Sequence, residues 1–153
     1  MIKIDPYFKP ILISSSVILA LNTLFLLPFI SPLFTYFVGG FLASYLFKAE
    51  MKDIYYEIKM KDIFFLGGAT GVVSGSIITL IIAVKLQNED LKMLILEMIN
   101  KQLQMNSNAE YPLLTQLEPS FYVITAIVTL FIAVLICFFG SLSAIPFLNK
   151  GKK

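Results

Sequence analysis

Long hydrophobic runs without any charge dominate the pattern of this chain. Three tracts contain no Lys, Arg, Asp or Glu, namely residues 10–47, 63–84 and 119–149. A bilayer core about 30 Å thick needs roughly 20 apolar residues in a helix, because each backbone polar group in lipid must be bonded within its own segment. The pattern therefore predicts membrane-spanning helices.

The first tract is too long for one crossing. Its 38 residues would extend about 57 Å as a single helix. Pro28 and Pro32 interrupt it, because proline removes a backbone donor and clashes with the preceding turn. We therefore expect four spans, at about 11–28, 32–47, 63–84 and 119–146.

Two segments between the spans have helical hydrophobic spacing. In residues 48–62 apolar side chains recur every three or four positions, which suits a short interfacial helix. Residues of about 87–105 place apolar side chains on one face, which predicts an amphipathic helix outside the membrane. Asp62 is expected to cap the third span, and Pro146 is expected to end the fourth.

The expected fold is an all-α integral membrane four-helix bundle, with residues 1–153 as a single transmembrane domain. Four spans place both termini on one side of the membrane. Nine lysines lie in the tails and the 48–62 linker, whereas three lie in residues 85–118. Because cytoplasmic segments carry the excess of lysine, we expect cytoplasmic N- and C-termini and an outer segment 86–118, either flat on the membrane or folded over the bundle.

Small residues recur along one face of each span. Because the hydrophobic effect does not join helices in lipid, small residues mark positions where backbones approach closely. The predicted packing residues are Gly39, Gly40, Ala43, Gly67, Gly71, Gly75, Ala126, Ala133, Gly140 and Ala144. These faces either pack within one bundle or bind another copy or a partner. Residues 39–43 also resemble residues 140–144, through duplication or through chance.

Composition narrows the possible chemistry. The chain is 58% hydrophobic and 14% charged, whereas soluble domains are about 25% charged. It contains no histidine and no tryptophan, so the usual haem ligand, the commonest zinc ligand and the commonest general base are missing. Its scattered lysines and lack of arginine argue against nucleic-acid binding. We expect no catalytic residue, no metal site and no cofactor.

Asn22 is the one amide side chain deep within the predicted spans. Asn22 is expected to bond to a neighbouring helix, since intramembrane asparagines commonly do so. Cys137 is expected to be an inert packing residue, and Glu89 and Asp90 to begin the outer helix, where acids are favoured. The absence of ionisable groups from the spans argues against ion-coupled transport.

From Asp62 onwards the chain resembles a family of small bacterial membrane proteins known as domain of unknown function 4199. The resemblance lies in the order of a glycine- and serine-rich span (67–76), an acidic amphipathic helix (89–105) and a last span ending in small residues and lysines (140–153). It implies a four-helix bundle and no assigned activity.

The leading functional hypothesis is a non-enzymatic protein of the bacterial inner membrane. It would be an accessory subunit of a larger membrane complex, or a small homo-oligomer, packing through its glycine-rich faces. Its partners would be the lipid bilayer and other membrane chains or itself. The alternative is a small holin-like pore or solute transporter.

Overall fold

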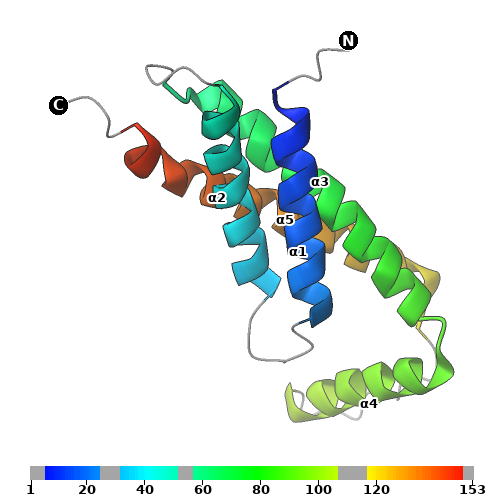
Figure 1. The fold of residues 1–153 in the computed structure, drawn as a ribbon. Helices are drawn as coiled ribbons and strands as arrows, with labels where there is room; N and C mark the ends of the chain where they lie inside the picture. Colours follow the sequence, from blue (N-terminus) through cyan, green and yellow to red (C-terminus); the bar gives the residue numbers. More distant parts are fainter. Residues whose placement is uncertain (1–5, 25–31, 52–56, 107–116, 150–153) are drawn as a thin grey trace.

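The computed structural model describes residues 6–24, 32–51, 57–106 and 117–149, which form five helices and no strand. The helices are α1 (Phe8–Leu24), α2 (Pro32–Glu50), α3 (Met60–Lys85), α4 (Glu89–Asn106) and α5 (Pro119–Leu148) (Figure 1). The expected all-α fold is confirmed for this part of the chain.

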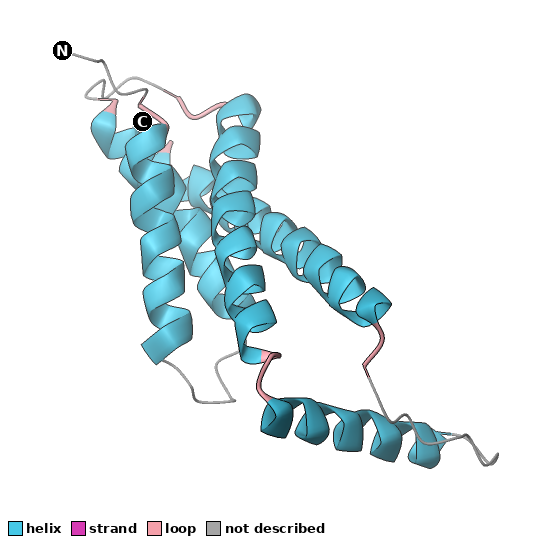
Figure 2. Cartoon of the chain, turned by 90° about the vertical axis from the view of Figure 1, so that its right-hand side faces the viewer, coloured by secondary structure: helices cyan, strands magenta, loops and turns pink. Residues whose placement is uncertain are grey.

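Four of the helices form a bundle, and α4 lies apart from it. Figures 1 and 2 show α1, α2 and α3 side by side, while α5 crosses them at a steep incline. The most extensive packing joins α5 to α3 and to α2. α4 lies crosswise near one end of the bundle and makes little contact with the other helices. α4 is therefore not folded over the bundle, which is one of the two arrangements expected for the outer segment.

Two helices are long and apolar enough to cross a membrane. These are α3, with 26 residues, and α5, with 30 residues. α1 is also apolar over Phe8–Asn22 but is shorter. The hydrophobic pattern thus identified at least two helices of membrane-spanning length.

The third helix begins earlier than predicted. α3 starts at Met60, so Asp62 lies inside its first turn and is fully buried. The Asp62 carboxylate accepts a 2.9 Å hydrogen bond from the backbone N–H of Lys59, which precedes the helix. A side chain at this position can reach back to cap the helix start. The helix is therefore longer than the predicted span 63–84 and includes ionisable side chains at its two ends.

Other boundaries also differ. α1 begins three residues before the predicted position 11 and ends at Leu24; the predicted break at Pro28 lies outside the described residues. α2 continues to Glu50 instead of ending near residue 47. α5 continues past Pro146, because a proline removes only its own donor and the N–H of Asn149 still bonds to the carbonyl of Ile145.

The interfacial helix predicted for residues 48–62 is not found where this segment is described. Residues 48–50 belong to α2 and residues 60–62 belong to α3. Residues 57–59 are not helical, and residues 52–56 lie outside the described ranges. Ile58, one of the apolar residues of this linker, is buried between the end of α2 and the start of α3.

Glycines of α3 let α5 approach its backbone. A Cβ atom added at Gly71 would lie 2.5 Å from the Cα of Val134, and one added at Gly67 would lie 2.7 Å from the Cα of Phe138. Both distances are far shorter than the optimal separation of about 3.5–4.0 Å between carbon atoms. A Cβ at Gly68 would meet no atom within 4 Å. The Gly67 and Gly71 face is therefore occupied by α5.

α2 and α5 meet through a reciprocal pair of glycines. A Cβ atom at Gly40 would overlap the carbonyl oxygen of Cys137, and one at Gly140 would overlap the carbonyl oxygen of Phe37. The arrangement is reciprocal, because Cys137 lies three positions before Gly140 and Phe37 lies three positions before Gly40. Ser141 adds a 2.8 Å hydrogen bond from its hydroxyl to the carbonyl of Gly40. The two similar segments, 39–43 and 140–144, thus take part in one crossing.

The remaining predicted packing residues lie at the same interfaces or beside α1. A Cβ at Gly39 would overlap the side chain of Ile18, and one at Gly75 would lie 3.0 Å from the Cβ of Ala133. Ala126 lines a small cavity of about 60 Å³ between α3 and α5. The fully buried alanines are Ala43, Ala133 and Ala144.

Candidate functional site

One end of the bundle, which we call the closed end, is filled by side chains from several helices. Tyr7, just before α1, donates a 2.7 Å hydrogen bond from its hydroxyl to the carboxylate of Asp62. Its ring stacks on that of Phe47 in α2, with centroids 4.6 Å apart. Phe47 belongs to a buried hydrophobic cluster with Ile63 and Leu66 of α3. The closed end therefore has a packed core around a bonded carboxylate.

Polar contacts join the chain segments at the rim of the closed end. The side-chain oxygen of Asn149, after α5, accepts a 3.3 Å hydrogen bond from the backbone N–H of Ile58. Lys9 of α1 forms an exposed ion pair with Glu50 of α2. These contacts bring the start of α1, the end of α2, the start of α3 and the end of α5 together.

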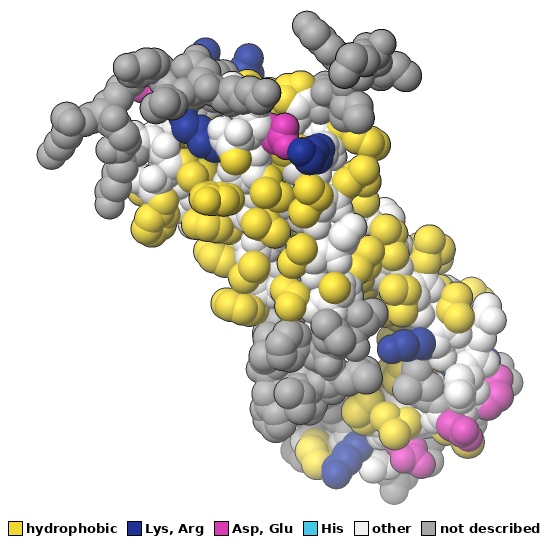
Figure 3. Space-filling model, in the orientation of Figure 1, with side chains coloured by type: hydrophobic (Ala, Val, Ile, Leu, Met, Phe, Trp, Pro, Cys, Tyr) yellow, Lys and Arg dark blue, Asp and Glu magenta, His cyan; other side chains and the backbone are white. Residues whose placement is uncertain are grey.

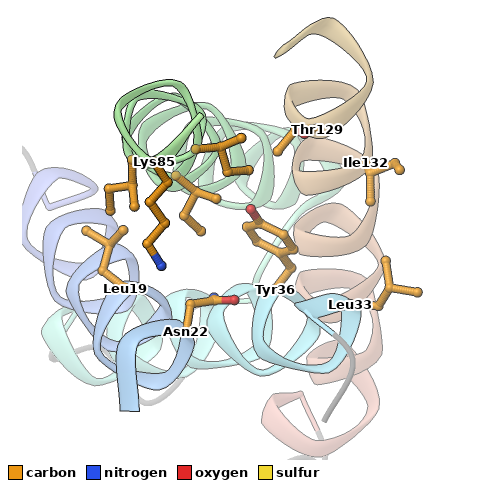
Figure 4. Close-up of a pocket in the computed structure, with 10 residues that line it drawn as sticks. Leu19, Asn22, Leu33, Tyr36, Lys85, Thr129 and Ile132 are labelled. Carbon is orange, nitrogen blue, oxygen red and sulfur yellow. The ribbon is translucent and has the colours of Figure 1, made fainter. Parts of the chain in front are cut away.

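The opposite end, which we call the open end, is hollow. A cavity of about 530 Å³ lies between α1, α2, α3 and α5 and is partly open to the surroundings (Figure 4). Its volume lies within the range of about 300–1,000 Å³ found for small-molecule sites. Its aliphatic walls are formed by Leu19, Leu33, Ile78, Ile81, Ile82 and Ile132.

Four polar side chains, one from each helix, complete the lining of the cavity. They are Asn22 of α1, Tyr36 of α2, Lys85 of α3 and Thr129 of α5. In Figure 4 the Tyr36 hydroxyl points into the cavity, and Lys85 extends from α3 toward α1. The cavity is thus apolar with a few convergent polar groups, which is the usual composition of a binding site.

Asn22 joins two helices beside the cavity. Its amide nitrogen donates to the carbonyl of Ile18, at 2.9 Å, and to the hydroxyl of Thr35 in α2, at 2.8 Å. The second bond is the kind of interhelical contact expected of Asn22. The amide nitrogen is therefore bonded within the protein. The side-chain oxygen lies on the cavity side of Asn22 (Figure 4).

Two of the polar groups lack a partner in the described part of the chain. Tyr36 is only 3% exposed, yet its hydroxyl has no hydrogen-bond partner there. Lys85 forms no ion pair with a described residue, and none of the described acidic residues lines the cavity. For the buried Tyr36 hydroxyl the lack of a partner is unusual, because leaving a buried polar group unsatisfied is costly, whereas Lys85 is exposed. A bound molecule with acceptor groups would supply the missing partners.

The other candidate residues lie outside this cavity. Cys137 is fully buried in α5 and contacts the carbonyl oxygen of Tyr36, with 3.3 Å between sulfur and oxygen. Glu89 begins α4, as predicted, and bonds to Lys92 at 2.7 Å. This hydrogen bond raises the pKa of Lys92 above its ordinary value. Within the described residues, no group of three His, Cys, Asp or Glu side chains is arranged to hold a metal ion.

Sequence reasoning did not identify Tyr36, Lys85 or the contact between Tyr7 and Asp62. Tyr36 looks like any aromatic residue within an apolar tract. Lys85 marks the end of a charge-free tract, which signals a helix end but not a cavity. Only the packing of four helices brings these side chains together.

Comparisons with protein-family models, curated proteins and solved structures found no match to this chain. The resemblance to domain of unknown function 4199 therefore stays a prediction.

Proposed function

We propose that α1, α2, α3 and α5 all cross the membrane. α3 and α5 have the required length and hydropathy. α1 and α2 have 17 and 19 residues, or roughly 25 and 28 Å at 1.5 Å per residue. Slight thinning of the bilayer accommodates spans of this length. In Figure 3 hydrophobic side chains cover the middle of the visible face, and charged side chains lie toward both ends.

The proposed orientation places the closed end in the cytoplasm. Four described lysines lie near the closed end, whereas three lie at the end of α3 or in α4. The first group is Lys9, Lys48, Lys59 and Lys61, and the second is Lys85, Lys92 and Lys101. The positive-inside rule then gives cytoplasmic N- and C-termini in a bacterial inner membrane, with residues 86–118 outside.

Cysteine labelling tests this orientation. Cys137 is fully buried and contributes little background. Lys101→Cys should react with an impermeant maleimide on intact cells, because residue 101 is exposed on α4. Lys9→Cys should react only after the membrane is permeabilised. The reverse pattern, or equal labelling of both sites, would overturn the topology.

We propose that the chain acts by binding, as a non-enzymatic accessory subunit of a larger membrane complex or as a small homo-oligomer. The hollow open end is the observation that carries this proposal. The bundle core is filled at one end only, and aliphatic side chains surround the hollow. Such walls suit retention of an apolar group and offer little for chemistry.

Contact with another chain would use the outer surface of α5. The glycine face of α3 is already covered by α5. The outer surface of α5 exposes a row of large apolar side chains, which are Val123, Ile124, Ile127, Val128 and Phe131. Glycine-mediated assembly, as first expected, would require this internal packing to open.

Purification in mild detergent tests the accessory role. We expect a discrete oligomer or a co-purifying membrane chain, identified by size and mass spectrometry. Phe131→Ala, on the exposed surface of α5, should weaken that assembly. Phe34→Ala provides the matched control, because Phe34 of α2 is similarly exposed. A monomer with no bound chain, or equal effects of both variants, would contradict the proposal.

The alternative of a pore or solute transporter draws less support. The hydrophobic cluster at the closed end blocks a continuous path through the described part of a single bundle. Solute flux through liposomes that contain only this protein would favour that alternative. Tight liposomes across several solutes would count against it.

A further inference from the structure

The open-end cavity has an apolar lining, which suits a hydrocarbon chain. Its aliphatic walls come from four helices and enclose about 530 Å³. In the membrane placement proposed above, on which this inference rests, the surrounding solvent is lipid. Apolar cavities hold water poorly, because water needs polar partners. An acyl chain is therefore the natural occupant of a partly open apolar cavity in a bilayer.

The ammonium group of Lys85 offers a positive charge to the headgroup of a bound lipid. Lys85 is the last residue of α3 and lines the cavity with Ile81 and Ile82 of the same helix. A lysine at a helix end extends its ammonium group toward the membrane surface, where lipid phosphates lie. Because no acidic side chain of the described residues lines the cavity, this charge is available to an anion.

Tyr36 supplies a second contact, within the cavity. Its hydroxyl is buried, points into the cavity and has no partner in the described residues. Tyr36 is the fifth residue of α2, so it lies about one helical turn inside the bundle. A phenol is a hydrogen-bond donor, and a lipid ester carbonyl is an acceptor.

We propose that the open end binds one anionic phospholipid of the surrounding membrane. One acyl chain lies against the aliphatic walls, the phosphate lies at the Lys85 ammonium group, and an ester carbonyl accepts a hydrogen bond from Tyr36. The protein is then a lipid-binding membrane component, and the lipid completes the core of the open end.

Native mass spectrometry of the purified protein tests this assignment. We expect one phosphatidylglycerol molecule per chain and weaker retention of zwitterionic phosphatidylcholine, because both lipids carry the phosphate but the choline cation of phosphatidylcholine repels the Lys85 ammonium group. Lipid extracted from the protein should be enriched in anionic phospholipid relative to the bulk membrane. Absence of bound lipid, retention without headgroup preference, or preferential retention of free fatty acid would overturn the proposal.

Matched variants distinguish lipid bound in the cavity from lipid bound non-specifically to the outer surface of the protein. Lys85→Gln should remove the preference for the anionic headgroup, and Tyr36→Phe should weaken retention of both lipids. Lys101→Gln and Tyr45→Phe should leave binding unchanged, because residues 101 and 45 are exposed and lie outside the cavity lining.

A cavity-filling variant provides a further test. Ile81→Trp should exclude the acyl chain, and circular dichroism and detergent unfolding should verify that it retains the helical fold. Equal loss in the Lys85→Gln and Lys101→Gln variants, or full lipid retention in a folded Ile81→Trp variant, would show that the cavity is not the site. The readout is bound lipid, so the proposal can fail while a role in protein assembly stands.

Discussion

The hydroxyl of Tyr7 donates a 2.7 Å hydrogen bond to the carboxylate of Asp62, 55 positions later in the chain. The same carboxylate accepts the backbone N–H of Lys59 and so orders the start of α3. One buried acid thus joins the residue before α1 to the first turn of α3. This contact lies beside the hydrophobic cluster that fills the closed end, whereas no acidic side chain of the described residues joins the helices around the open-end cavity.

Tyr7→Phe should destabilise the closed end. The substitution keeps the aromatic ring on Phe47 and removes only the donor to Asp62. Loss of a hydrogen bond to a charged group costs about 1.5–3 kcal/mol. Unfolding in mild detergent measures the change. Tyr45→Phe is the control, since Tyr45 is 52% exposed, and an equal loss in both variants would contradict this role of Tyr7.

Two neighbouring glycines of α3 should respond oppositely to alanine. Gly71→Ala places a Cβ 2.5 Å from the Cα of Val134, and overpacking of this kind costs about 1–3 kcal/mol. Gly68→Ala meets open space and should be neutral or stabilise α3 by up to about 1 kcal/mol, because alanine favours the helix. Detergent unfolding of both variants checks the contrast. Equal stability would mean that α3 and α5 do not pack in this register.

Gly40→Ala and Gly140→Ala should each loosen the crossing of α2 and α5. Both added methyl groups overlap backbone carbonyl oxygens, which cannot rotate away. Once one methyl group has separated the helices, the second has less packing to disrupt. The double variant should therefore lose less stability than the two single losses combined. A double-mutant cycle measures this coupling, and strict additivity would argue against a shared crossing.

Asn22→Leu should weaken the contact between α1 and α2. The variant loses the 2.8 Å bond to the hydroxyl of Thr35, and interhelical bonds in membranes contribute about 0.6 kcal/mol on average. Ser16→Ala is a suitable control, because the exposed Ser16 hydroxyl bonds only within α1 among the contacts described, to the carbonyl of Leu12. Unfolding experiments should show a loss for Asn22→Leu and none for Ser16→Ala.

Glu89→Gln should lower the pKa of Lys92. The hydrogen bond from Lys92 to Glu89 raises that pKa above 10.5 in the folded chain. The raised pKa means that the contact stabilises α4 fully below pH 10.5 and loses its effect as the pH rises through the folded value. NMR titration of the lysine amine measures the shift. Glu97→Gln should leave the pKa of Lys92 unchanged. An equal decrease in both variants would mean that the overall negative charge of α4, and not the contact with Glu89, raises this pKa.

Much of the local structure follows from the sequence. Charge-free tracts predicted where helices lie, because a hydrophobic run of sufficient length favours a helix in lipid. Helix ends were less predictable. Asp62 reads as the residue before a span, but the hydrogen bonds from Lys59 and Tyr7 to its carboxylate let the helix begin at Met60.

The candidate site could not be predicted in the same way. Asn22 stands out in the sequence as a polar residue in an apolar tract, whereas Tyr36 does not. What distinguishes Tyr36 is the lack of a partner for its buried hydroxyl, and this depends on every helix around it. No local pattern carries that information.

The sequence by itself determined the helical class of the chain, the approximate position of its helices and the faces rich in small residues. Those features depend on the periodicity and composition of neighbouring residues. Only the tertiary structure decided that Gly71 meets Val134, that Gly40 and Gly140 share one crossing and that the open end is hollow. The physical reason is that a crossing depends on the fit between surfaces far apart in the chain, and a cavity is the space where that fit is incomplete.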